Sequence, residues 1–171
     1  AAKTNRIRIG TAVEVLPLGN PLRMAEEAAT VDHISQGRLD FGVGRAGQPK
    51  SYLGYNIPYS ESRARFLESL EIILKAWTQE RFSHTGQFYS YQDVCLVPKP
   101  YQTPHPPIRV AANSADTFPM IAQMGFPIFI TAVGIPSSLK ERIQTYKKTW
   151  QETGHQGTGD ISLRVPVYVS N

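Results

Sequence analysis

Apolar residues along the first third of the chain predict a strand, a helix and a second strand. Residues 6–16, RIRIGTAVEVL, alternate and then become continuously apolar, which predicts a buried strand. Asn20 before Pro21 is typical of a helix start, and Gly37 follows the expected helix end. The apolar face of this helix repeats at helical spacing: Leu22, Ala25, Ala28, Ala29 and Ile34. A strand is predicted next at 39–43.

The clearest amphipathic helix follows a loop-like stretch at 48–59. Ser60 or Ser62 can cap it, and its apolar positions have helical spacing: Phe66, Leu70, Ile73, Leu74 and Trp77. Residues 81–97 alternate around Thr85-Gly86 and predict a hairpin-like excursion. The prolines between 98 and 107 predict an extended connector rather than a domain linker, because elements of the same kind resume after it.

The second half repeats the pattern of strand and helix. It predicts a strand at 108–112, a helix near 115–124 that Gly125 ends, and a strand at 128–131. Ser137 or Ser138 can cap a further helix that Gly154 ends, with one apolar face: Leu139, Ile143, Tyr146 and Trp150. A last strand is predicted at about 161–169.

Five strands separated by four helices and one hairpin predict a parallel α/β sheet with helical cover. The pattern fits an open doubly wound sheet or part of a (β/α)8 barrel, and it does not distinguish them. We expect residues 1–171 to form one partial domain. The chain starts without methionine and stops directly after an apolar strand, so we expect a piece of a longer protein.

Composition narrows the class of partner. The 18 basic and 14 acidic residues give a net charge of +4, and the basic residues are scattered, which argues against nucleic-acid binding. No apolar run approaches the ~20 residues that span a bilayer. The single cysteine excludes an internal disulfide and a cysteine zinc cage and suits a reducing compartment, so we expect a cytoplasmic protein. The four histidines lack metal-ligand spacing, so no metal is expected.

The stretch GVGRAG at 42–47 fits the dinucleotide-binding pattern G-x-G-x-x-G. Its context does not, because Gln48-Pro49 follows and no helical pattern starts until about residue 60. The glycines then end a strand and deliver Arg45, whose guanidinium suits a phosphate or carboxylate. A surface arginine on a turn is the alternative.

A second candidate anion site follows the strand at 108–112. Asn113 and Ser114 precede the expected helix, and Thr117 lies in its first turn, so free N–H groups and hydroxyls would gather there. Simple N-capping by Asn113 or Ser114 is the alternative. Its position favours a site, because ligands bind at the carboxyl ends of parallel strands. Glu14, near the end of the first strand, is expected to face solvent.

Three strings in this order resemble the bacterial luciferase-like flavin-dependent monooxygenases: IGTAVEVLPLGNPLRMAEEAATVDHISQGRLDFGVGRAG, ESRARFLESLEIILKAW and PPIRVAANSADTF. The resemblance implies a (β/α)8 TIM barrel that binds reduced FMN, or the deazaflavin F420 in a sister branch. This chain would supply strands three to seven, without the first two and the eighth.

The resemblance also implies site residues. Arg45 would hold the flavin phosphate, with the backbone near Gly47 beside it, and the helix start would complete the site: Asn113, Ser114 and Thr117. Ala12-Val13 would lie under the flavin ring, at a position where the family often has a non-prolyl cis peptide.

Two departures from the family pattern stand out. Gly44 replaces a reactive cysteine of luciferase, and Gly47 replaces a bulkier residue. The histidine that relatives use near the flavin would come from the missing second strand, so no catalytic residue is assigned.

The implied activity is oxidation of a small organic substrate by O2 and reduced FMN. A separate flavin reductase would supply the reduced flavin, and the whole protein would be a homodimer. Two alternatives stay open: an F420-dependent hydride-transfer oxidoreductase, and a flavin-binding homologue without turnover.

Overall fold

The computed structural model describes residues 1–131, 137–164 and 167–169. The chain divides into two compact units, Ala1–Pro107 and Ile108–Asn171. The expectation of one partial domain over residues 1–171 stays a prediction.

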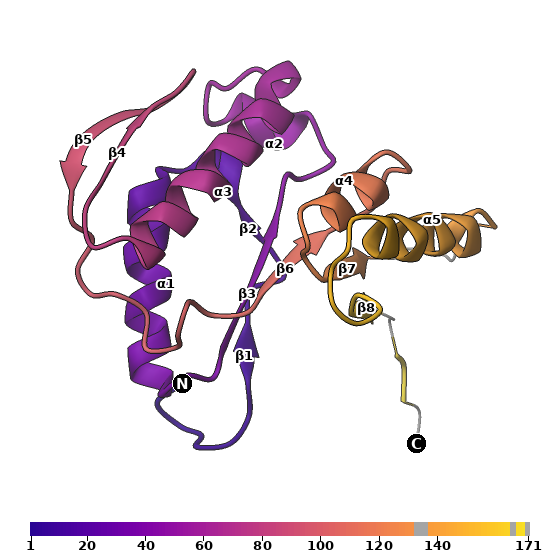
Figure 1. Cartoon of the computed structure of the whole chain (residues 1–171), viewed down its shortest axis with the longest axis horizontal. Coiled ribbons are helices and arrows are strands. Elements are labelled where there is room, and N and C mark those ends of the chain that lie inside the picture. The colour runs from indigo at the N-terminus through magenta and orange to yellow at the C-terminus, as the bar shows by residue number, and fades with distance from the viewer. Residues whose placement is uncertain (132–136, 165–166, 170–171) are drawn as a thin grey trace. The chain divides into compact units, whose positions relative to one another are not determined.

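The first unit is built on a parallel sheet (Figure 1). β1 (Ile9–Gly10) and β2 (Glu14–Val15) both pair in parallel with β3 (Leu39–Gly44). The single strand expected at 6–16 is therefore wrong. Gly10 pairs with Asp40 and Glu14 with Val43, so four steps along one side oppose three along the other, and the extra residue forms a bulge.

The helices α1 (Pro21–Ser35) and α3 (Ser62–Thr78) lie side by side against this sheet (Figure 1). The Asn20 side chain accepts the N–H groups of Leu22 and Arg23, which confirms the predicted cap. Ile34 is exposed, contrary to the expected apolar face. Asp32 and Ser35 are buried in this last turn instead, because both side chains have hydrogen-bond partners. Asp32 accepts the main-chain N–H of Gln102, and Ser35 donates to the Asp32 carbonyl and accepts the N–H of Arg38.

The start of α3 also differs from the prediction. Neither Ser60 nor Ser62 caps it, because the 3-10 turn η2 (Tyr59–Glu61) runs directly into the helix and Glu61 takes the N-cap position. Two more short elements carry no sequence signal: the 3-10 turn η1 (Leu16–Leu18) and the helix α2 (Lys50–Leu53).

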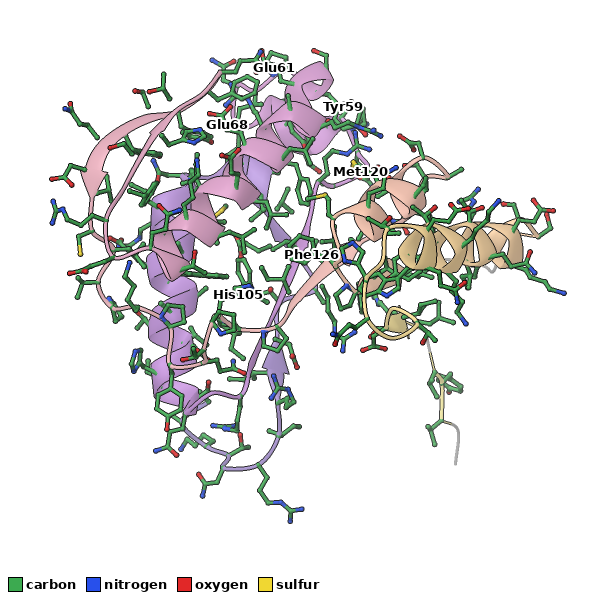
Figure 2. The ribbon with its side chains drawn as sticks, viewed as in Figure 1. Tyr59, Glu61, Glu68, His105, Met120 and Phe126 are labelled. Atoms are coloured by element: carbon green, nitrogen blue, oxygen red, sulfur yellow. The ribbon has the colours of Figure 1, made fainter. Side chains whose placement is uncertain are left out.

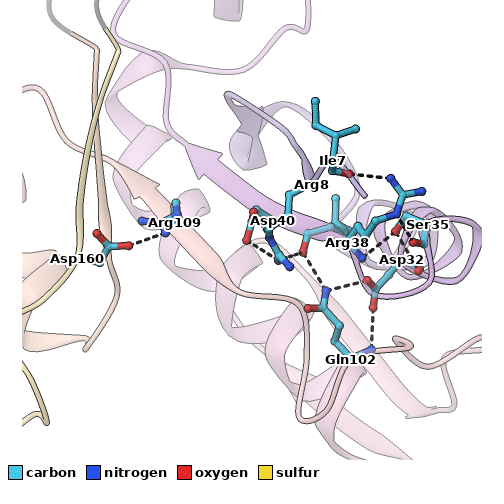
Figure 3. A network of polar contacts seen from close by, with 10 residues as sticks. Ile7, Arg8, Asp32, Ser35, Arg38, Asp40, Gln102, Arg109 and Asp160 are labelled. Carbon is cyan, nitrogen blue, oxygen red and sulfur yellow. Dashed lines mark hydrogen bonds and ion pairs between the residues drawn. The ribbon is translucent and has the colours of Figure 1, made fainter. Parts of the chain in front are cut away.

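The predicted hairpin is confirmed as β4 (Phe82–Thr85) paired antiparallel with β5 (Ser90–Val94). The proline-rich connector then returns across the unit. The buried Asp32 carboxylate accepts the main-chain N–H and the side-chain amide of Gln102, both at 2.8 Å (Figure 3). The Pro107 carbonyl accepts the N–H of Phe41 in β3, so the connector is fastened to both the helix and the sheet.

The second unit contains three parallel strands: β6 (Ile108–Ala111), β7 (Ile128–Thr131) and β8 (Ile161–Arg164). Its helices are α4 (Thr117–Gln123) and α5 (Leu139–Glu152), which contact each other (Figure 1). Phe118, Ile121 and Tyr146 are fully buried.

Three expectations for this unit need correction. Helix α4 begins at Thr117 rather than 115, because Pro119 lacks an N–H and is tolerated only in a first turn. Ser138 precedes α5 but its side chain forms no capping hydrogen bond, and Ser137 is not the N-cap. The last strand ends at Arg164; of the expected extension, 165–166 lie outside the described residues and 167–169 are not in a strand.

In the part of the chain that the structure describes, no helix combines the length and the apolar character needed to cross a membrane.

Candidate functional site

The residues predicted to hold a cofactor form two groups, one in each unit. Ala12, Val13, Arg45 and Gly47 belong to the first unit, and Asn113, Ser114 and Thr117 to the second. In the first unit, Ala12 and Val13 lie between β1 and β2, and Arg45 and Gly47 come after the end of β3. In the second unit, Asn113, Ser114 and Thr117 come after the end of β6.

Arg45 follows the last residue of β3, and its side chain has a neutral partner. Its Nη1 lies 3.5 Å from the Oγ of Ser62, and its main-chain carbonyl accepts a hydrogen bond from the hydroxyl of Tyr52. No Asp or Glu among the described residues forms an ion pair with it, whereas Arg8 pairs with Asp40 at 2.7 Å. The guanidinium therefore keeps a charge that an anion can neutralise.

The glycine run around Arg45 is not a dinucleotide loop. Gly42 lies in β3, where a Cβ would overlap the Thr11 carbonyl oxygen, so this glycine permits a close approach of two strands. The chain then turns at Ala46, whose φ is +57°, and Gly47 is exposed. The next helix is the four-residue α2, so no long helix presents its N-terminus to a pyrophosphate.

The peptide bond between Ala12 and Val13 is cis, as the resemblance implies. It lies in the bulge between β1 and β2, opposite the second half of β3. Thr11 fixes this bulge by donating its hydroxyl to the Gly42 carbonyl at 2.7 Å. The Ala12-Val13 segment is thus held beside β3, the strand that Arg45 directly follows.

The second group surrounds the turn before α4. The hydroxyls of Ser114 and Thr117 are 2.6 Å apart, and the N–H of Thr117 donates to the Ser114 carbonyl. Capping by Asn113 or Ser114 is wrong, because Asp116 takes the N-cap position and no side chain caps it. The hydroxyls of Ser114 and Thr117 therefore bond to each other across the turn and do not cap the helix.

Three residues that contact these groups carry no sequence signal for that role: Tyr52, Ser62 and Arg142. Tyr52 lies in a stretch whose pattern predicts a loop, and the pattern around Ser62 predicts only a helix cap. Arg142 of α5 donates from Nη1 to the Asn113 carbonyl at 2.6 Å and fastens the second turn. No periodic pattern distinguishes these three, because each acts through a contact with a residue at least seven positions away.

A separate polar cluster joins α3 to the hairpin, and Figure 2 labels its central residue, Glu68. Glu68 accepts the main-chain N–H groups of Gln87, Phe88 and Tyr89 and lies 3.2 Å from Nε2 of His84. Burial opposes the charged form, but these donors prevail and lower the pKa of Glu68 below its ordinary value. No three His, Cys, Asp or Glu side chains in the described ranges could hold a metal ion.

Comparison with known proteins identifies the family. The sequence-family model of the luciferase-like monooxygenases matches residues 1–171. The chain belongs to this family.

Curated relatives are longer than the chain. An uncharacterized protein of Sinorhizobium fredii is 36% identical over 133 residues, which cover 78% of this chain and 38% of that protein. The oxygenase component of a flavin-dependent trigonelline monooxygenase from Acinetobacter baylyi is 30% identical over 84% of the chain and 40% of its own length. The alkanal monooxygenase alpha chain of Photorhabdus luminescens is 30% identical over 89% and 42%.

Solved structures of other proteins have the same fold as this chain. The monooxygenase RslO1 from Streptomyces bottropensis has a TM-score of 0.87 and 32% identity, over 95% of this chain and 50% of that one. An F420-dependent secondary alcohol dehydrogenase reaches a TM-score of 0.79 at 17% identity, which shows the fold alone. The luciferase-like TIM-barrel fold is thus confirmed, and the chain spans about half of these solved chains.

Proposed function

We propose that this luciferase-like chain is part of an oxygenase that binds reduced FMN and uses O2 to oxidise a small organic substrate. The observation that carries the proposal is Arg45, a guanidinium at a strand end with a hydroxyl partner and, among the described residues, no carboxylate partner. Such a group suits the dianionic phosphate that ends FMN.

The donor set of each unit, taken by itself, suits a phosphate group. Arg45 offers charged N–H donors, and Ser114 and Thr117 offer hydroxyls that can reorient toward a phosphate oxygen. The backbone at Gly47 and Asn113 adjoins these donors in sequence. The main chain at Ala12-Val13 would support the ring. When bound, the reduced flavin supplies the electrons for oxygen chemistry, and no acid or base of this chain is assigned to it.

Two partners follow from the proposal. The trigonelline relative is named an oxygenase component, and a 3,6-diketocamphane monooxygenase of the same fold is named an oxygenating constituent in complex with FMN. By analogy, a separate reductase supplies reduced flavin here. We also propose that the whole protein is a homodimer in the cytoplasm.

The alternative cofactor is F420, because a protein of the same fold binds it. Parallel spectral titrations with FMN and F420 distinguish the two, and tighter binding of F420 would favour hydride transfer. If the protein binds FMN but neither oxidises reduced flavin nor consumes O2 with candidate substrates, it is a flavin-binding homologue without turnover.

The decisive experiment removes the guanidinium. In the complete protein, Arg45→Ala should weaken FMN binding by about 1.5–3 kcal/mol, the range for a hydrogen bond to a charged group. Riboflavin, which lacks the phosphate, should bind as before. Arg23→Ala is the matched control, because Arg23 is exposed on α1 and pairs with Glu27. An FMN affinity that Arg45→Ala leaves unchanged contradicts the phosphate assignment.

A further inference from the structure

The main chain at Arg45 is held by a buried tyrosine that lies seven residues further along. Tyr52 is 1% exposed, and its hydroxyl donates to the Arg45 carbonyl. The ring of Tyr59 meets the Tyr52 ring edge-on, with centroids 5.2 Å apart. The short helix α2 thus folds back and fixes the peptide from which the Arg45 side chain extends.

The side chain of Arg45 is held separately. Ser62 is 2% exposed, and its Oγ accepts from Nη1 of Arg45 at 3.5 Å. Ser62 does not cap α3, because Glu61 takes the N-cap position and no side chain forms a capping hydrogen bond there. A buried serine that caps nothing and faces a guanidinium is well placed to orient it.

Both partners are neutral, which matters for anion binding. Burial raises the pKa of Tyr52, while the Ser62 hydroxyl and the Arg45 charge lower it in part, so the phenol stays a protonated donor. A carboxylate in place of Ser62 would hold the Arg45 guanidinium as firmly but would neutralise its charge, and the Tyr52 position requires a donor because it faces the Arg45 carbonyl. Hydroxyls orient the arginine and leave the charge for a ligand, which reduces the side-chain entropy lost on binding.

We propose that Tyr52 and Ser62 are positioning residues for Arg45, with Tyr52 fixing its main chain and Ser62 its guanidinium, so that the arginine is oriented before an anion arrives. The inference rests on the proposed function, in which that anion is the FMN phosphate. It assigns a role to the stretch at 48–62, which carries no periodic sequence signal.

The test measures FMN and riboflavin affinities of variants of the complete protein. Tyr52→Phe keeps the buried ring and removes the hydroxyl, and Ser62→Ala removes the acceptor without removing a helix cap. Tyr52→Phe should weaken FMN binding about 2- to 12-fold, the range for one neutral hydrogen bond, and leave riboflavin binding unchanged. Ser62→Ala should have an effect of the same size, because its contact with the charged Arg45 guanidinium is long, at 3.5 Å. Tyr55→Phe is the matched control, because Tyr55 lies on the same segment with 60% of its surface exposed.

A double-mutant cycle separates positioning from general loosening of the fold. In an Arg45→Ala background, Tyr52→Phe should cause no further loss of FMN affinity, because nothing is left to position. Equal losses for FMN and riboflavin, or no loss for FMN, would overturn the inference. If Arg45→Ala changes the preference for FMN but Tyr52→Phe and Ser62→Ala do not, the inference alone fails. If Arg45→Ala does not change that preference, the proposed function fails first.

Discussion

Replacing Glu68 by glutamine should loosen the β4–β5 hairpin and destabilise the first unit. The two carboxylate oxygens accept main-chain N–H groups of Gln87, Phe88 and Tyr89 at 2.9–3.2 Å and face His84. Glutamine keeps one acceptor oxygen, but its amide group would point a donor at a donor. The loss of one or two hydrogen bonds to a charged group amounts to about 2–4 kcal/mol.

The pH dependence supplies a second signature. The hydrogen bonds lower the pKa of Glu68 below its ordinary value of 4.5, against the effect of burial. A carboxyl with a lowered folded pKa stabilises the protein above its unfolded pKa, and this stabilisation is lost as the pH falls through the folded value. The wild-type free energy of unfolding should therefore fall below about pH 4.5. Glu68→Gln should lack this component, because its side chain does not titrate.

Urea denaturation at pH 7 and at lower pH measures both effects, and amide hydrogen exchange at residues 87–89 localises them. Glu71→Gln is the matched control: Glu71 lies one turn further along α3, is 55% exposed, and contacts Lys75 at 2.7 Å and Nδ1 of His84 at 3.9 Å, but it accepts no hydrogen bond from the hairpin main chain among the described residues. Its loss should change stability by less than about 1 kcal/mol. Equal unfolding midpoints for Glu68→Gln and the wild type would refute the stabilising role of Glu68, as would unchanged exchange at residues 87–89.

Two further predictions concern the glycine run and the second unit. Gly42→Ala should destabilise the folded protein by about 1–3 kcal/mol in thermal or urea melts, because its Cβ would overlap the Thr11 carbonyl. Gly47→Ala should be tolerated, because no described atom lies within 4 Å of its added Cβ. If Gly47→Ala proves the more harmful, the glycine run has a role that the packing does not explain. Burial, and to a lesser extent the charge of Asp160, raises the pKa of Tyr146 from 10 to about 12 in the folded protein. The stability that this shift provides is therefore present below pH 10 and is lost as the pH rises from about 10 to about 12. Tyr146→Phe should remove that alkaline loss, and an unchanged alkaline profile would contradict the assignment.

Elements that depend on local signals could be predicted from the sequence. The Asn20-Pro21 start of α1 is correct because the cap and the proline act on adjacent residues. The face of α3 is largely correct because its apolar residues recur at helical spacing, and Phe66, Leu70 and Trp77 are buried.

Features that depend on distant contacts could not be predicted in the same way. The bulge between β1 and β2 rests on Thr11 meeting Gly42, 31 positions away, and no local pattern reports that approach. Pro119 did carry a local signal for the later start of α4, because a proline is excluded beyond the first turn. The roles of Tyr52 and Ser62 arise only when α2 and α3 fold against the end of β3. The flavin site itself stays a prediction from the resemblance.

The two hydrogen bonds between Gln102 and the Asp32 carboxylate also have a consequence for the folding kinetics. The two residues are 70 positions apart, and closing a loop of that length costs about 4 kcal/mol in chain entropy. The hairpin and the helices form within much shorter stretches, so we expect the connector to dock after the folding barrier has been crossed. An interaction that forms so late slows unfolding rather than speeding folding. Asp32 would then set the unfolding rate of the first unit and have little effect on its folding rate.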